Sequence, residues 1–153
     1  MDAESASILG PGEGRTFHIG LDPVTVKFPG SDTGAGFAVI ESVVSPGVPG
    51  PPPHIHRDGL AECWYVLDGE LEFLVGDSAR RAPSGSFAYV PPGVVHTFSN
   101  PGEGPARFIG MFSIARGLSM LEEFAAAFPA EGGPPDEGRI ADVFRRFDVE
   151  VVP

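Results

Sequence analysis

The sequence contains little cysteine and no long apolar segment. Cys63 is the single cysteine among 153 residues, so no internal disulfide can form, and cysteine usage gives no sign of an oxidising compartment. Nowhere do 18 apolar residues follow one another, and the chain starts with an acidic segment rather than an apolar one. These features argue against a membrane span and a signal peptide. We therefore expect a cytoplasmic protein without a membrane partner.

Basic residues are also scarce. The chain has 10 lysine and arginine residues against 21 aspartate and glutamate residues, which gives a formal net charge of −11 at pH 7. A field of this sign repels the phosphate groups of nucleic acids and anionic membrane surfaces. We therefore expect no nucleic-acid partner.

Glycine and proline, in contrast, are abundant. The 21 glycines and 17 prolines, with 12 phenylalanines spread along the chain, indicate short strands separated by turns rather than a helical bundle. The length fits one domain with its own core. The predicted class is mainly β, with one active site.

Strand-like apolar runs recur after residue 14. The preceding residues 1–14 are small, polar and glycine-rich, and we predict a flexible N-terminal segment there. Asp68-Gly69 is the tightest hairpin candidate. The number of runs predicts a barrel or sandwich, with strands at 15–19, 24–28, 37–44, 62–67, 71–75, 86–90, 96–99 and 106–114.

The hydrophobic period changes after Gly117. Apolar residues then recur at helical spacing in two groups, which predicts two amphipathic helices after the barrel and a last strand at 148–152. Each helix has one apolar stripe that must be buried, so we expect the tail 118–153 to pack outside the barrel near its mouth. The stripes consist of Leu118, Leu121, Phe124, Ala125 and Phe128, and of Ile140, Val143, Phe144 and Phe147.

Three histidines and a glutamate form the candidate site. His54 and His56 are one residue apart, so on a strand both side chains leave the same face about 7 Å apart. An Asp-Gly turn signal can fold Glu62 back beside them, and His96 begins another strand. Three imidazole nitrogens and one carboxylate oxygen suit one divalent transition metal ion: Fe, Ni, Mn, Co, Cu or Zn. A His-x-His pair by itself is more often an exposed strand than a metal site.

A second motif strengthens the metal interpretation. Gly85, Pro91, Gly93, His96 and Asn100 follow the spacing of the second conserved motif of the cupin family, which the chain resembles over about a third of its length. The resemblance implies a double-stranded β-helix, the cupin or jelly-roll barrel, over 15–117. It also implies a bound metal ion and, together with the sheet edges and an apolar outer face, a homodimer.

The first cupin motif fits apart from its opening glycine, which is displaced, and one spacing. His54, His56, and Glu62 with Gly69 after it agree with the family, which implies that His54, His56, Glu62 and His96 are the metal ligands. However, five residues separate His56 from Glu62, where the family usually has three or four. Asp58 is therefore a rival carboxylate, although Glu62 keeps the expected distance to Gly69.

Aromatic residues are candidates for a substrate pocket. By the family's pattern the ligands point into the barrel, so alternation turns Trp64 and Val66 inward with Glu62, and Phe98 inward with His96. Phe73 and Phe112 are further candidates. For each of these residues, plain core packing is at least as good an explanation.

The resemblance also suggests a function. The run from Glu62 to Phe73 and the helical tail are similar to small proteins grouped with quercetin 2,3-dioxygenase. This similarity implies a dioxygenase that acts on a phenolic or enolic small molecule, with dioxygen as a candidate co-substrate and Glu62 as the catalytic proton acceptor. A non-redox cyclase or isomerase of a polyketide-type pathway and a non-catalytic ligand-binding protein stay open, because cupins host many functions on one scaffold.

Overall fold

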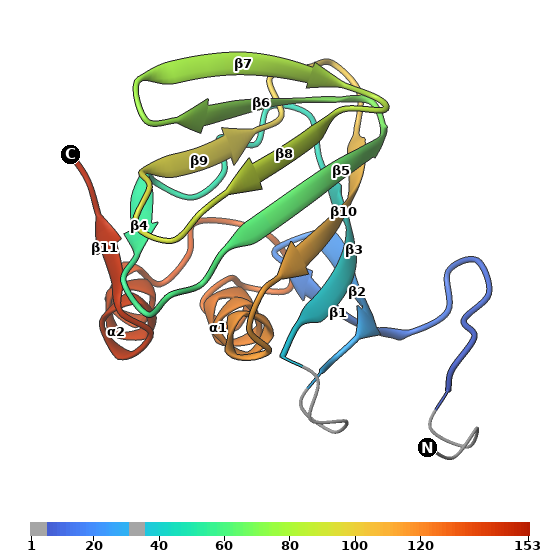
Figure 1. The fold of residues 1–153 in the computed structure, drawn as a ribbon, viewed down its shortest axis with the longest axis horizontal. Coiled ribbons are helices and arrows are strands. Elements are labelled where there is room, and N and C mark those ends of the chain that lie inside the picture. Colours follow the sequence, from blue (N-terminus) through green and yellow to red (C-terminus); the bar gives the residue numbers. More distant parts are fainter. Residues whose placement is uncertain (1–5, 31–35) are drawn as a thin grey trace.

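The computed structural model describes residues 6–30 and 36–153, and it consists of two antiparallel sheets followed by two helices (Figure 1). The first sheet has the order β1-β2-β3-β10-β5-β8, and the second has the order β11-β4-β9-β6-β7. The predicted mainly β fold with two C-terminal helices is confirmed. The strands are β1 (Arg15–Ile19), β2 (Asp22–Phe28), β3 (Ala38–Val44), β4 (His54–His56), β5 (Glu62–Asp68), β6 (Glu70–Val75), β7 (Ser78–Pro83), β8 (Phe87–Val90), β9 (His96–Ser99), β10 (Ala106–Phe112) and β11 (Val149–Val151).

Strict alternation along the strands builds the core between the sheets. In β3 and β10 every second residue is buried, as expected for strands with one face on a core. Val24, Val66 and Leu71 are each 1% exposed or less. Burying an aliphatic side chain of this size stabilises the fold by about 1.5–3 kcal/mol. Residues 1–5 of the predicted flexible segment lie outside the described part of the chain.

The chain changes sheets at Asp68-Gly69, so the predicted hairpin there is wrong. β5 pairs with β10 and β8, whereas β6 pairs with β7 and β9. Gly69 has φ 73°, and a Cβ atom there would lie 2.5 Å from the carbonyl oxygen of Pro105. This close approach and the left-handed backbone both require glycine. The Asp-Gly turn signal thus marks a corner between the sheets.

A tight hairpin instead joins β6 to β7. Val75 pairs with Ser78, which leaves Gly76 and Asp77 as a two-residue turn. The sequence pattern missed β7, because this edge strand is almost entirely exposed and carries no apolar alternation. Ion pairs from Arg81 to Glu70 and Glu72 hold it to β6. Charged residues on an edge strand also oppose unwanted pairing with other chains.

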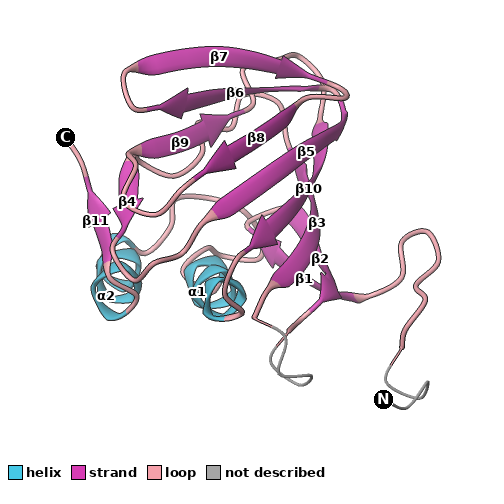
Figure 2. Ribbon diagram, viewed as in Figure 1, coloured by secondary structure: helices cyan, strands magenta, loops and turns pink. Residues whose placement is uncertain are grey.

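Both helices lie at one open end of the two sheets (Figure 2). They are α1 (Arg116–Ala125) and α2 (Glu137–Arg146). The Asp136 side chain accepts a hydrogen bond from the backbone N–H of Arg139 and so caps α2. Their apolar faces belong to the same core as the strands, through Leu118, Met120, Val143 and Phe144. Among the described residues, no helix has the length and apolar character needed to cross a membrane.

The last strand places the end of the chain beside the histidines. Val149 of β11 pairs with His56 of β4, and Val151 pairs with His54. On its other side β4 pairs with β9 through His54 and His96. The short histidine strand is therefore held between β9 and a strand from the C-terminal tail.

Candidate metal centre

The two histidines of β4 follow a proline-rich segment that cannot form a regular hydrogen-bonded ladder. Just before it, Gly50 has φ 72°, and a Cβ atom there would lie 1.7 Å from the carbonyl oxygen of Phe98. The hydroxyl of Thr97 donates to the carbonyl of Pro51 at 2.5 Å. These contacts fix the approach to β4 against β9, and so fix the position of His54.

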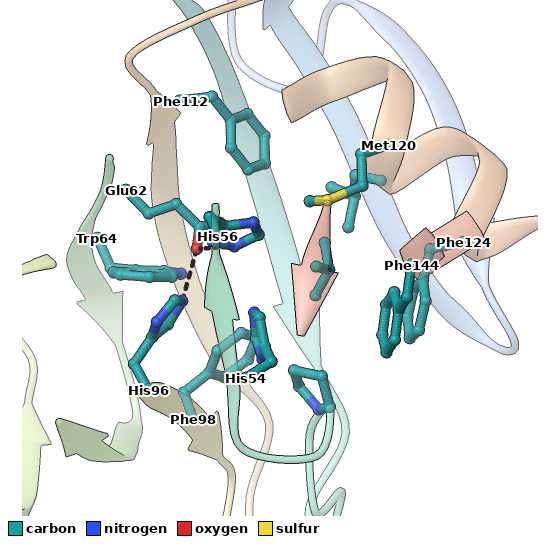
Figure 3. Close-up of a pocket in the computed structure, with 13 residues that line it drawn as sticks. His54, His56, Glu62, Trp64, His96, Phe98, Phe112, Met120, Phe124 and Phe144 are labelled. Carbon is teal, nitrogen blue, oxygen red and sulfur yellow. Dashed lines mark hydrogen bonds and ion pairs between the residues drawn. The ribbon is translucent and has the colours of Figure 1, made fainter. Parts of the chain in front are cut away.

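The four predicted ligands meet in the barrel interior (Figure 3). Glu62 Oε2 lies 3.0 Å from His56 Nε2 and 2.7 Å from His96 Nε2. One ligand atom from each of His54, His56, Glu62 and His96 lies within 4.8 Å of all the others. All four residues are buried, at 8% exposure or less. Residues from β4, β5 and β9 are thus brought together although 42 positions separate the first from the last in the sequence.

Backbone carbonyls orient two of the imidazole rings. His54 Nδ1 donates to the carbonyl of Pro52 and His96 Nδ1 donates to the carbonyl of Val94, both at 2.9 Å. A carbonyl can only accept, so Nδ1 carries a proton in both rings, and a metal ion would bind these rings at Nε2. Such outer contacts are the usual way in which a protein aims histidine ligands.

The electrostatics of the site are those of a carboxylate among imidazoles. Burial by itself would raise the pKa of Glu62, but hydrogen bonds from His56 and His96 outweigh it and lower the pKa to about 2. Burial and the neighbouring His96 lower the pKa of His54 to about 4. Burial acts against a charge on His96 as well, yet the bond to Glu62 raises the pKa of that ring. The site therefore favours a negative charge on Glu62 and a positive charge on the neighbouring His96.

These residues fit a divalent metal ion. A metal ion binds neutral imidazoles and ionised carboxylates. At pH 7 His54 is neutral and Glu62 is ionised, so both are in the form that a metal ion needs. The Nδ1 atom of His56 is buried and has no hydrogen-bond partner among the described residues, which is costly unless another group satisfies it. A three-nitrogen, one-oxygen donor set in a buried position suits a first-row transition metal.

Asp58, the rival carboxylate, lies elsewhere. Its Oδ2 atom is 3.2 Å from the guanidinium of Arg116 in α1, and its Oδ1 atom accepts a hydrogen bond from the backbone N–H of Leu60. Arg116 also donates to the backbone carbonyl of Arg146 at 2.6 Å. The long loop between His56 and Glu62 thus connects to the helical tail, and its aspartate is not part of the ligand cluster.

A cavity of about 70 Å³ opens onto the four ligands. Of the residues predicted to bind a substrate, Trp64, Phe98 and Phe112 line this cavity. Val66 and Phe73 are buried in the core and do not line it. The further lining residues are Pro51, Met120, Leu121, Phe124, Phe144 and Val149.

Most of these further lining residues come from the C-terminal tail. The helical spacing of Leu121, Phe124 and Phe144 did indicate a buried face, but it could not show that this face covers the cavity. Met120 is not part of either predicted apolar stripe, so nothing in the sequence pattern indicated that it lines a cavity. In Figure 3 the side chains of Met120, Phe124 and Phe144 lie on the side of the cavity opposite Trp64 and His96.

Comparison with known protein families and proteins finds similarity to cupins. Residues 40–112 match the family model described as "Cupin domain". The chain is 34% identical over 93 residues to quercetin 2,3-dioxygenase of Bacillus subtilis, a match that covers 60% of this chain and 26% of that protein. The chain therefore spans about a quarter of the length of this relative.

Solved structures share the fold. An RmlC-like cupin from Shewanella frigidimarina superposes with a TM-score of 0.59 at 22% identity, covering 73% of this chain and 94% of the other. The polyketide cyclase RemF from Streptomyces resistomycificus superposes with a TM-score of 0.58 at 20% identity, covering 70% and 78%. At these identities the likeness concerns the fold alone. Residues 40–112 therefore match a cupin domain, and the fold of the chain is that of a cupin.

Proposed function

We propose that this cupin is a metal-dependent enzyme that acts on a small phenolic or enolic molecule, as a dioxygenase of the quercetinase type. The observation that carries the proposal is the cluster of His54, His56, Glu62 and His96 at one side of an otherwise apolar cavity. The similarity to the Bacillus subtilis enzyme supports the reaction class.

The four ligands would hold one divalent ion, which supplies Lewis-acid and, for a redox-active metal, one-electron chemistry. The apolar walls, among them Trp64 and Phe112, would exclude water and hold the substrate ring. Only Oε2 of Glu62 accepts the two imidazole hydrogen bonds. We propose that the other carboxylate oxygen, Oε1, takes the hydroxyl proton of the substrate.

The test combines metal analysis with oxygen uptake. Protein loaded separately with Fe, Mn, Co, Ni, Cu or Zn is offered a panel of phenols and enols, and both oxygen consumption and product formation are followed. Oxygen consumption that matches product formation supports the dioxygenase. Conversion without oxygen consumption would replace it with a cyclase or isomerase, and binding without conversion would indicate a ligand-binding cupin. A Leu21→Ala variant, changed at an exposed turn, serves as control.

We also propose that the chain forms a homodimer. The outer face of β5, β8 and β10 carries large apolar side chains that are 41–63% exposed: Tyr65, Phe87, Tyr89 and Met111. Strand pairing places Tyr65 beside Phe87 and puts Cys63 between Tyr89 and Met111, so these residues form one continuous apolar face. An exposed apolar face of this kind marks an interaction surface, and in a homodimer the same face of a second copy would cover it across a two-fold axis.

A further inference from the structure

Among the described residues, none with a lysine or arginine side chain lines the cavity. Apart from the ligand cluster, every described residue that lines it is apolar. The arginines nearest to it in sequence and fold are engaged elsewhere: Arg116 with Asp58, Arg146 with Glu123 and Asp142, and both lie over the ring of Phe147. A carboxylate on a bound molecule, beyond the atoms that contact the metal, would therefore be buried without a partner, which is strongly unfavourable.

Stacked aromatic rings connect the candidate ligand His54 with the helices α1 and α2. The ring of Phe144 is stacked on His54 with an interplanar angle of 16° and a centroid distance of 6.3 Å. The ring of Phe144 is also stacked with Phe124, with an interplanar angle of 3° and a centroid distance of 5.8 Å. The faces of these rings are the natural contact for another flat ring.

The size of the cavity limits the occupant. Its volume of about 70 Å³ is smaller than the roughly 150 Å³ of an engineered apolar cavity that binds benzene. A single ring can enter if a flexible side chain such as Met120 moves. A molecule of three rings far exceeds this volume, and Leu118 and Val143 anchor in the core the two helices, α1 and α2, that contribute to the cavity wall.

We propose that the site selects an uncharged, one-ring phenol or enol, held against the ring of Phe144, and that the C-terminal helices set this selection. This inference rests on the proposed function and narrows its substrate class. Phe144 is thus a specificity-determining residue supplied by the tail, outside the cupin domain match at 40–112.

The test is a binding experiment with zinc-loaded protein, which needs no turnover. Trp64 is the single tryptophan of the chain and lines the cavity, so quenching of its fluorescence reports binding directly. The probes are catechol, 4-methylcatechol and 3,4-dihydroxybenzoate, which share one chelating unit and differ in a methyl or carboxylate group. We expect 4-methylcatechol to bind at least about tenfold more tightly than 3,4-dihydroxybenzoate, because only the latter buries an unpaired charge.

Matched variants test the role of Phe144. Phe144 and Phe147 are 9% and 7% exposed, but only Phe144 lines the cavity. Phe144→Leu should weaken catechol binding about two- to tenfold, whereas Phe147→Leu should leave it unchanged at a comparable loss of thermal stability. Zinc content, measured on every sample, should be the same.

Three results would overturn the inference: equal binding of the methyl and carboxylate probes, an unchanged catechol affinity in Phe144→Leu, or displacement of catechol by the three-ring flavonol quercetin. A protein that binds no zinc would remove both this inference and the proposed function. Selective catechol binding without any oxygen consumption or conversion would contradict the proposed function alone.

Discussion

The Asp58 carboxylate lies 3.2 Å from the Arg116 guanidinium, and this contact joins the loop between His56 and Glu62 to the first C-terminal helix. A second ion pair, between Arg57 and Glu150, joins the same loop to β11. This loop has five residues where the family usually has three or four, and in this chain it has structural partners in the tail. Its aspartate positions the tail, and Glu62 is the carboxylate among the histidines.

Replacing Asp58 and Glu62 one at a time by their amides should separate the structural role of Asp58 from the role of Glu62 at the candidate metal site. Asp58→Asn should leave the metal content unchanged and lower the melting temperature by a few degrees, because a partly exposed ion pair contributes at most about 1 kcal/mol. Asparagine can still accept the Leu60 N–H. Elemental analysis and thermal unfolding check both expectations.

Glu62→Gln should behave in the opposite way. Three histidines should retain most of the metal, while turnover falls by roughly 10²–10⁴, as expected when a general base is lost. Steady-state rates on a substrate from the phenol panel give the measurement. If Asp58→Asn abolishes metal binding or activity while Glu62→Gln has little effect, the assignment of the carboxylate ligand is wrong.

The purified protein should carry close to one transition metal ion per chain, because the four ligand atoms converge within 4.8 Å. His96→Ala should lower this occupancy, since it removes the ring that contacts Glu62 at 2.7 Å. His18→Ala, which changes an exposed histidine on β1, is the control. Protein that neither contains metal nor binds added Fe, Ni, Mn or Zn would contradict the site.

Truncation after Gly117 should abolish cooperative unfolding. It removes core residues from both helices and takes β11 away from β4. The loss of several side chains worth about 1.5–3 kcal/mol each approaches the roughly 5–15 kcal/mol by which a domain is stable. Circular dichroism on heating measures this. A truncated chain that stays soluble with an unchanged melting temperature would show that the tail is dispensable.

Light scattering should give about twice the 16.0 kDa of one chain. Phe87→Asp, on the outer apolar face and 63% exposed, should shift the protein to a monomer. Leu21→Asp, at a turn and 69% exposed, should not. A mass near that of one chain at micromolar concentration would rule out the dimer.

Local pattern was sufficient for most elements. Alternating burial follows directly from the period of two in a strand, so runs such as 15–19 and 96–99 were predicted at their observed bounds. The helices were predicted because an apolar stripe at helical spacing can be buried in only one way. β7 was missed for the reverse reason, since an exposed edge strand has no apolar period to detect.

The sequence by itself determined the class of fold and the three histidines of the candidate site, because strand alternation and motif spacing are properties of neighbouring residues. Only the tertiary structure decided which carboxylate meets the histidines, since Asp58 and Glu62 differ in the partners that the fold brings to them. It also decided that Asp68-Gly69 is a corner between sheets. Finally, it showed that Met120, Phe124 and Phe144 line the cavity, because the contact between the tail and the barrel depends on how distant segments pack.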